Sequence, residues 1–141
     1  MSRRIEDLHP AVQAKCRAHI AACHAEGIDF LITSTYRDAA EQAALYAQGR
    51  TAPGKIVTNA KPGQSMHNYR LAYDVVPMRN GKPVWGNARP EDAALWARIG
   101  ELGEAQGLEW AGRWRKFREM PHFQWTGGLT LADLQAGKLP A

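Results

Sequence analysis

Two histidines and one aspartate have neighbours that suggest a chemical role. His67 follows a polar stretch that contains glycine, and Asp74 lies inside the apolar run 71–76 that comes next. His122 stands at the start of a second predicted strand, Phe123–Trp125, with two aromatic residues. An unpaired carboxylate inside a buried strand would be costly, so Asp74 requires a cation close by. A metal ion is one candidate for that cation.

The three side chains also form a recognisable donor set. Two histidines and one carboxylate are typical of catalytic zinc sites, in which a fourth position stays open for water and substrate. The alternative, which spacing alone does not exclude, is a group of polar side chains that satisfy one another in the core. Both interpretations require His67, Asp74 and His122 to meet in the folded chain.

Glu119 would give this set a mechanism. It precedes His122 by three residues with Pro121 between them, and the residue before a proline favours extended backbone. A carboxylate that lies beside a metal ion without binding it is the general base that a zinc hydrolase needs. The alternative is an ordinary surface glutamate paired with Arg115 or Arg118.

Cys16, His19 and Cys23 form a second cluster, on one face of a predicted helix. They lack a fourth ligand, and cysteine is among the residue types most often buried. We therefore expect two core cysteines beside a histidine at the edge of the core. Their helical separation of about 10.5 Å exceeds the limit of about 7 Å between disulfide Cα atoms, so no disulfide is expected.

The elements that must position these side chains follow from apolar periodicity and from capping and turn residues. Asp7 is predicted to cap the first helix, and Asp38 with Glu41 forms a capping box for the second. In chain order we expect a helix from Pro10 that Gly27 ends, a strand at Ile28–Thr33, a helix at Ala39–Gln48, a long loop at Arg50–Gln64, a strand at Leu71–Val76, a hairpin turn at Asn80-Gly81 leading into Pro83–Trp85, a helix from Pro90 that ends before Gly107, a basic aromatic segment at Trp110–Arg118, a strand at Phe123–Trp125 and a short helix capped by Thr130 and Asp133. This order predicts an α+β fold, with a small antiparallel sheet and flanking helices.

Length and composition set the broad class. The chain has 141 residues, enough for one domain, and we expect a single domain over residues 1–141. Hydrophobic residues make up 45% and charged residues 23%, which is typical of globular proteins. The apolar runs are too short to span a membrane, and the N-terminus does not resemble a signal peptide, so we expect a cytoplasmic product. The net charge of +4 favours an anionic partner.

The spacing Ser65-x-His67-(x6)-Asp74, followed by Glu119-x-x-His122, resembles the motifs of the zinc D-Ala-D-Ala peptidase superfamily, the M15 peptidases with a hedgehog-like fold. The resemblance is closest to phage endolysins that act as L-alanyl-D-glutamate endopeptidases. It covers about residues 5–137, nearly the whole chain. Further segments that resemble the family are Ile32–Arg37, Glu41-Gln42, Leu45-Tyr46, Gln48–Thr51, Pro62–Ser65 and Trp110–Gln124.

The resemblance implies that His67, Asp74 and His122 bind one zinc ion per chain and that Glu119 activates a water molecule. Two positions depart from the family pattern. The family usually has glycine where this chain has Arg70, which would be strained by about 1–3 kcal/mol if the position requires a positive φ. Otherwise Arg70 would direct a charge towards the substrate. The endolysins often have aspartate where this chain has Glu119, which leaves the cleaved bond open.

The resemblance gives three further polar side chains a place in the site. Arg37 would hold the substrate carbonyl or its developing oxyanion, and Ser65 and Gln42 would line the site. From the residues alone, a surface arginine paired with Asp38 or Glu41 is the preferred interpretation of Arg37. The corresponding alternative for Ser65 and Gln42 is ordinary loop and helix polarity.

The implied function is that of a zinc-dependent peptidase that hydrolyses the L-Ala–D-Glu bond of the peptidoglycan stem peptide. The alternative within the same chemistry is a D-Ala-D-Ala carboxypeptidase or dipeptidase. A remote alternative is a non-catalytic basic binding module, because Arg113–Arg118 interleaves cations with aromatic rings, as in proteins that bind single-stranded nucleic acid. Such a module would leave Asp74 and the two histidines unexplained.

The resemblance also implies a biological setting. A phage endolysin would wait in the host cytoplasm until a holin-type protein opens the membrane, and would then act on the wall in the periplasm. We expect a monomer without a separate wall-binding domain, without membrane insertion and without a nucleic acid partner.

Overall fold

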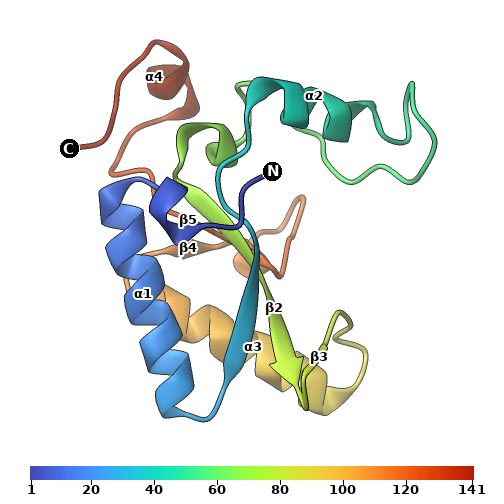
Figure 1. The fold of residues 1–141 in the computed structure, drawn as a ribbon, viewed down its shortest axis with the longest axis vertical. Helices are drawn as coiled ribbons and strands as arrows, with labels where there is room; N and C mark the ends of the chain where they lie inside the picture. The colour runs from blue at the N-terminus through green and yellow to red at the C-terminus, as the bar shows by residue number, and fades with distance from the viewer.

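A small antiparallel sheet with helices around it forms the protein, as the computed structural model of residues 1–141 shows (Figure 1). The strand order is β1-β2-β5-β4, and β3 pairs with β2. The strands are β1 (Asp29–Ser34), β2 (Ala72–Arg79), β3 (Lys82–Pro83), β4 (Glu109–Trp110) and β5 (His122–Gln124). The helices are α1 (Pro10–Ala25), α2 (Ala39–Ala47), α3 (Pro90–Glu104) and α4 (Leu131–Gln135), with 3₁₀ turns η1 (Ile5–Asp7), η2 (Met66–Tyr69) and η3 (Ala111–Arg113). The predicted α+β class is confirmed.

The two faces of the sheet have different surroundings. On the core face, Tyr73 and Val75 of β2 and Phe123 of β5 pack with α1 and α3 in one hydrophobic cluster. Because successive residues of a strand point to opposite faces, Asp74 and its strand neighbour Ala72 point the other way. We call this second face the site face. No helix of the protein combines the length and the apolar character needed to cross a membrane.

Most predicted elements are present, with three differences. The first helix begins at Pro10 and its cap is His9, whose Nδ1 accepts a hydrogen bond from the Ala11 amide at 3.1 Å. Asp7 therefore does not cap this helix; it lies too early and belongs to η1. Strand β2 extends beyond the predicted Val76 because its far end pairs with β3 in the hairpin. Strand β4 was not predicted. Its first residue, Glu109, precedes the predicted basic aromatic segment, and its second, Trp110, is the first residue of that segment.

The cysteine cluster of α1 belongs to the core. Cys16 and Cys23 are both buried and free, as expected. His19 is fully buried, which corrects its predicted place at the edge of the core. Its ring nitrogens lie 2.7 Å from the Tyr73 hydroxyl and 2.8 Å from the Ile99 carbonyl oxygen. Because both nitrogens have partners, burial of this polar ring is tolerated.

Candidate metal centre and active-site cleft

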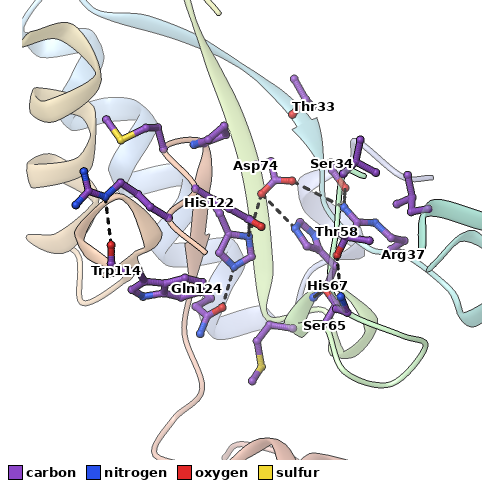
Figure 2. A pocket seen from close by; sticks show the side chains of 18 of the residues that line it. Thr33, Ser34, Arg37, Thr58, Ser65, His67, Asp74, Trp114, His122 and Gln124 are labelled. Atoms are coloured by element: carbon purple, nitrogen blue, oxygen red, sulfur yellow. Dashed lines mark hydrogen bonds and ion pairs between the residues drawn. The ribbon is translucent and has the colours of Figure 1, made fainter. Parts of the chain in front are cut away.

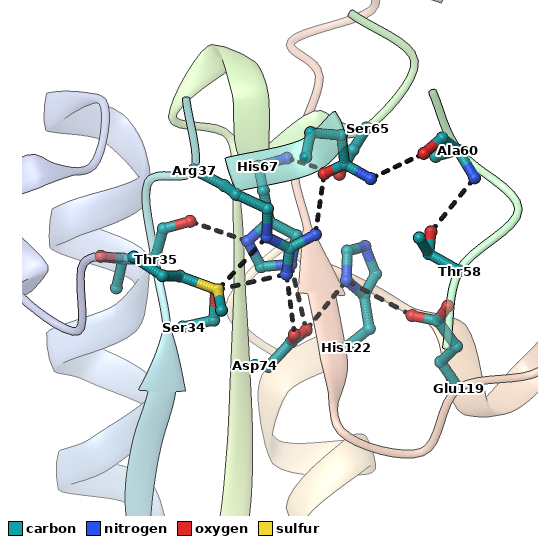
Figure 3. A network of polar contacts seen from close by, with 12 residues as sticks. Ser34, Thr35, Arg37, Thr58, Ala60, Ser65, His67, Asp74, Glu119 and His122 are labelled. Atoms are coloured by element: carbon teal, nitrogen blue, oxygen red, sulfur yellow. Dashed lines mark hydrogen bonds and ion pairs between the residues drawn. The ribbon is translucent and has the colours of Figure 1, made fainter. Parts of the chain in front are cut away.

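His67, Asp74 and His122 converge on the site face of the sheet. His67 Nε2 lies 3.2 Å and His122 Nδ1 lies 3.0 Å from the same oxygen, Asp74 Oδ1. The candidate ligand atoms all lie within 4.8 Å of one another. Figure 3 shows the two imidazole rings directed at this carboxylate.

Strand register and one short turn bring these three residues together. Asp74 and His122 are direct partners in the antiparallel β2–β5 pair, so their side chains lie next to each other on one face. His67 comes from η2, where the Ser65 hydroxyl caps the turn by accepting from the His67 amide at 3.2 Å. The turn ends at Arg70, whose φ of 64° is left-handed. The position that usually holds glycine in the family therefore requires a positive φ.

The protonation of the two rings makes the centre a cation site. The Thr35 carbonyl can only accept, and it lies 2.7 Å from His67 Nδ1, so Nδ1 carries a proton and Nε2 is the nitrogen that faces Asp74. His122 Nε2 likewise donates to Gln124 Oε1 at 2.8 Å. Nε2 of His67 and Nδ1 of His122 thus face one carboxylate, and a metal ion can replace the protons that these nitrogens share with it. Two imidazoles and one carboxylate are a donor set that fits zinc.

Asp74 has the charge state that such a site needs. Burial acts to raise the pKa of its carboxyl group, but the neighbouring imidazoles of His67 and His122 outweigh burial and hold that pKa below its usual range. Arg37 adds a further positive charge, with Nη2 3.8 Å from Asp74 Oδ2. The carboxylate is therefore ionised when the protein is folded.

Arg37 is a buried residue of the site. It is 8% exposed and its ion pair is with Asp74. Asp38 and Glu41 instead form the capping box of α2, so the surface-pair alternative for Arg37 is wrong. Burial lowers the pKa of the Arg37 guanidinium, and the negative charge of Asp74 acts in the opposite direction.

Gln42 holds the Arg37 guanidinium in place by a hydrogen bond. Its Oε1 accepts from Arg37 Nη1 at 2.9 Å, and its Nε2 donates to the Ala60 carbonyl at 2.7 Å. Gln42 is fully buried and does not line the pocket, which corrects the expectation that it does. It links the arginine to the long loop between α2 and η2 instead.

Glu119 lies beside the three converging side chains. Its Oε2 is 3.8 Å from His122 Nδ1, and its side chain is half-exposed at the pocket wall. Neither Arg115 nor Arg118 forms an ion pair with it, so the surface-pair alternative for Glu119 is also wrong. The Glu119 amide donates to the Ala111 carbonyl at 3.2 Å, which anchors the extended segment before Pro121.

A pocket of about 880 Å³ opens over the centre (Figure 2). This volume is in the range of small-molecule and peptide sites. Ser65 is among the lining residues, as expected, and Arg37 and Arg118 line the pocket together with the carboxylates of Asp74 and Glu119. Three further segments form the other walls of the pocket. They are the loop before η2 (Val57, Thr58, Ala60 and Gln64), the loop before α3 (Trp85 and Asn87) and the segment after η3 (Trp114 and Met120).

Sequence reasoning missed several polar groups of the site. Gln124 was detectable, because a residue two positions after His122 on a strand shares its face. Ser34 was not, because it faces Asp74 only through an irregularity in the β1–β2 pair. Ile32 pairs with Val75, and the next pair is Ser34 with Asp74, so β1 has one extra residue there. Such a bulge re-aims side chains next to a site.

Comparisons with known proteins agree with this geometry. Residues 58–125 match the family model described as D-alanyl-D-alanine carboxypeptidase of the M15 peptidases. The chain is 38% identical over 122 residues to the peptidoglycan L-alanyl-D-glutamate endopeptidase CwlK of Bacillus subtilis (strain 168), covering 84% of this chain and 73% of that protein.

Solved structures show the same fold at lower identity. The L-Ala D-Glu endopeptidase ChiX of Serratia marcescens has a TM-score of 0.64 at 21% identity, covering 93% of this chain and 86% of that one. A Zn(II) complex of the vancomycin-resistance D,D-pentapeptidase VanY has a TM-score of 0.61 at 16% identity, covering 94% and 80%. With CwlK similar across most of both sequences, the chain belongs to the M15 family of peptidases.

Proposed function

We propose that this protein is a zinc-dependent peptidase that hydrolyses the L-Ala–D-Glu bond of the peptidoglycan stem peptide. The observation that carries the proposal is the convergence of His67, Asp74 and His122 in a pocket that also holds Glu119. The choice of bond is supported by CwlK, which is an L-alanyl-D-glutamate endopeptidase.

The metal would be held by His67 Nε2, Asp74 Oδ1 and His122 Nδ1, the three atoms that already converge. Zinc, when bound, polarises a carbonyl group and lowers the pKa of a water molecule towards about 7. The remaining work of catalysis falls to side chains of the pocket.

Glu119 is the proposed general base. Its carboxylate lies beside a ligand nitrogen, and its half-exposed position gives it access to the pocket. Glu119 Oε2 would take the proton of the attacking water and deliver it to the nitrogen of the leaving amine. Both transfers need a carboxylate that is not itself a ligand.

Arg37 is the proposed stabiliser of the developing negative charge on the scissile carbonyl oxygen. Hydrogen bonds to Gln42 Oε1 at 2.9 Å and to Ser34 Oγ at 3.4 Å hold the guanidinium in place before substrate arrives. A donor that is already oriented needs little reorganisation during the reaction, which is the main source of electrostatic catalysis. Ser65, at the pocket wall, would contact the substrate.

The test is Glu119→Gln, which keeps the shape of the side chain and removes the base. We expect bound zinc to remain and the rate on purified peptidoglycan to fall about 10²- to 10⁴-fold, because proton transfer is lost. Glu101→Gln, on the exposed surface of α3, is the matched control and should keep the wild-type rate. A Glu119→Gln variant with wild-type activity would contradict the assignment.

Mass spectrometry of the digest distinguishes the cleaved bonds. Free N-terminal D-Glu identifies the L-Ala–D-Glu endopeptidase, and released D-Ala identifies the carboxypeptidase that the matching family model describes. A chelator should abolish either product, and added zinc should restore it.

We also propose that the enzyme acts in lysis as a monomeric endolysin with a single domain. This rests on the resemblance of residues 62–74 and 110–124 to phage endopeptidases. The enzyme would stay in the host cytoplasm until a holin-type protein opens the membrane, and would then cleave the wall in the periplasm. Expression in a Gram-negative host should cause lysis only with a co-expressed holin, and lysis without it would contradict this setting.

A further inference from the structure

Four side chains form a closed ring of contacts beside the metal centre, and three of them, His122, Gln124 and Trp114, are labelled in Figure 2. His122 Nε2 donates to Gln124 Oε1 at 2.8 Å, and Gln124 Nε2 donates to Glu109 Oε2 at 3.1 Å. Trp114 Nε1 donates to the other carboxylate oxygen, Glu109 Oε1, at 2.9 Å. The centre of the Trp114 ring lies 5.7 Å from the centre of the His122 ring, so the contacts return to the residue from which they start.

Strand pairing builds this ring. Glu109 of β4 and Gln124 of β5 are register partners, so their side chains lie side by side on the site face. His122 is two residues before Gln124 on the same strand and shares that face. Glu109 does not line the pocket and therefore does not touch the substrate.

The chemistry of Glu109 decides where His122 carries its proton. An amide can present either its oxygen or its NH₂ group, so Gln124 alone leaves both tautomers of His122 possible. An ionised carboxylate only accepts hydrogen bonds, so Gln124 must turn its NH₂ group to Glu109 and its oxygen to His122. His122 must then hold a proton on Nε2, so Nδ1, which faces Asp74, is the nitrogen left for a metal ion.

We propose that Glu109 is a positioning residue of the metal centre, which acts through Gln124 to hold His122 in the tautomer that can bind a metal. Trp114 keeps Glu109 in place by donating to its second oxygen. The other histidine does not need such a device, because a backbone carbonyl fixes the tautomer of His67. Of the two histidines, His122 is therefore the one whose tautomer depends on side chains, those of Gln124 and Glu109, which mutation can change.

Glu109→Gln tests the proposal, because the new amide has one donor end and one acceptor end. One of the two donors, Trp114 Nε1 or Gln124 Nε2, must then meet an NH₂ group. If Gln124 turns over, its own NH₂ group faces His122 Nε2, which must then give up its proton. The ring keeps a proton only on Nδ1, the nitrogen that would bind the metal.

The first measurement is ¹⁵N NMR of the imidazole rings in the metal-free protein. We expect His122 to carry a proton on Nε2 in the wild type and to lose that proton in Glu109→Gln, which leaves a proton only on Nδ1 beside Asp74. The second is zinc affinity, by competition with a chromophoric chelator. Loss of a group that orients a metal ligand typically costs about 10- to 100-fold in affinity, and we expect a weakening of that size.

Two variants separate this role from a general effect of charge or folding. Glu104→Gln makes the same charge change at a neighbouring acid that pairs with Arg113, and it should keep the tautomer and the zinc affinity. Glu109→Asp keeps an acceptor-only group and should keep the proton on His122 Nε2. A folded Glu109→Gln that retains this proton and wild-type zinc affinity would overturn the proposal, and so would loss of the Nε2 proton in Glu109→Asp.

The proposal rests on the proposed function only in one respect, namely that weaker zinc binding would lower peptidase activity. The tautomer is measured without metal and without substrate. If Glu119→Gln kept wild-type peptidase activity while Glu109→Gln shifted the tautomer, the proposed function would fail and the role of Glu109 would stand.

Discussion

Arg70 occupies a backbone conformation that favours glycine, and its side chain offsets part of the cost. Its Nη1 donates to the Asp7 carbonyl at 2.8 Å, and its guanidinium lies 3.9 Å from the centre of the Tyr36 ring. These contacts tie the turn that carries His67 to the N-terminal segment. Arg70 therefore has two opposing effects on stability: its backbone conformation is unfavourable, and its side chain makes favourable contacts with a distant segment of the chain.

Two substitutions separate the strain from the contacts. Arg70→Ala and Arg70→Gly both lose the side-chain contacts, but only alanine keeps an unfavourable left-handed conformation. We expect Arg70→Gly to be more stable than Arg70→Ala by about 1 kcal/mol. Denaturant unfolding of the two variants measures this difference, and equal stability would show that the turn carries no strain.

At the same scale, some site residues could be predicted from the sequence and others could not. His67, Asp74 and His122 were detectable because polar groups inside or beside apolar strands need partners. The role of Gln42 was not detectable, because its burial depends on the carbonyl of Ala60, which a long loop brings back to it. Gln124 was missed although strand alternation could have indicated it, whereas the Glu109 contact needed the pairing of β4 with β5.

Helix α3 approaches the sheet so closely that two of its positions have no room for a side chain. A Cβ at Gly100 would overlap the Trp110 ring, and a Cβ at Gly103 would overlap the Phe123 ring. Phe123 follows His122 on β5, so the spacing between helix and strand also supports the metal centre. Glycine here serves packing at the expense of helix propensity.

Gly103→Ala is therefore expected to destabilise the protein. Alanine favours a helix by about 1 kcal/mol over glycine, but overpacking a core costs about 1–3 kcal/mol. We expect a net loss in the free energy of unfolding, measured by denaturant titration. Gly86→Ala is the control, because nothing lies within 4 Å of a Cβ there, and it should be neutral. A more stable Gly103→Ala would show that Phe123 can move aside.

The elements differ in how far local sequence determines them. Pro90 and the capping box at Asp38 marked helix starts correctly, because these signals act within one turn. Strand β4 has only two residues and forms because β5 pairs with it, so no periodicity could indicate it. The bulge in β1 likewise depends on its partner strand and on no local signal.

His19 connects the main parts of the molecule. It lies on α1 and contacts Tyr73 of β2 and the Ile99 carbonyl of α3. Burial lowers its pKa from 6.5 to about 4, although the contact with Ile99 acts in the opposite direction. Burial raises the pKa values of its neighbours Cys16 and Tyr73, so neither titrates in the acid range.

Acid should therefore weaken the whole fold through this residue. The folded state binds fewer protons than the unfolded state between the two pKa values, so the stability is complete above pH 6.5 and is lost as the pH falls towards 4. The loss amounts to about 3 kcal/mol. His19→Gln does not titrate, and it should show a smaller loss in denaturant unfolding between pH 7 and pH 4. Parallel pH profiles for the two proteins would exclude His19 as the cause.

The two faces of the sheet separate the residues that stabilise the fold from the residues that line the cleft. On β2 and β5, Tyr73, Val75 and Phe123 serve the core, while the residues between them serve the cleft. Residues of the loop at 57–60 line the cleft but do not belong to the hydrophobic core, so they can be exchanged without disturbing the interior. New bond preferences would therefore arise at such loop positions, because the alternate positions of β2 and β5 hold the proposed metal ligands.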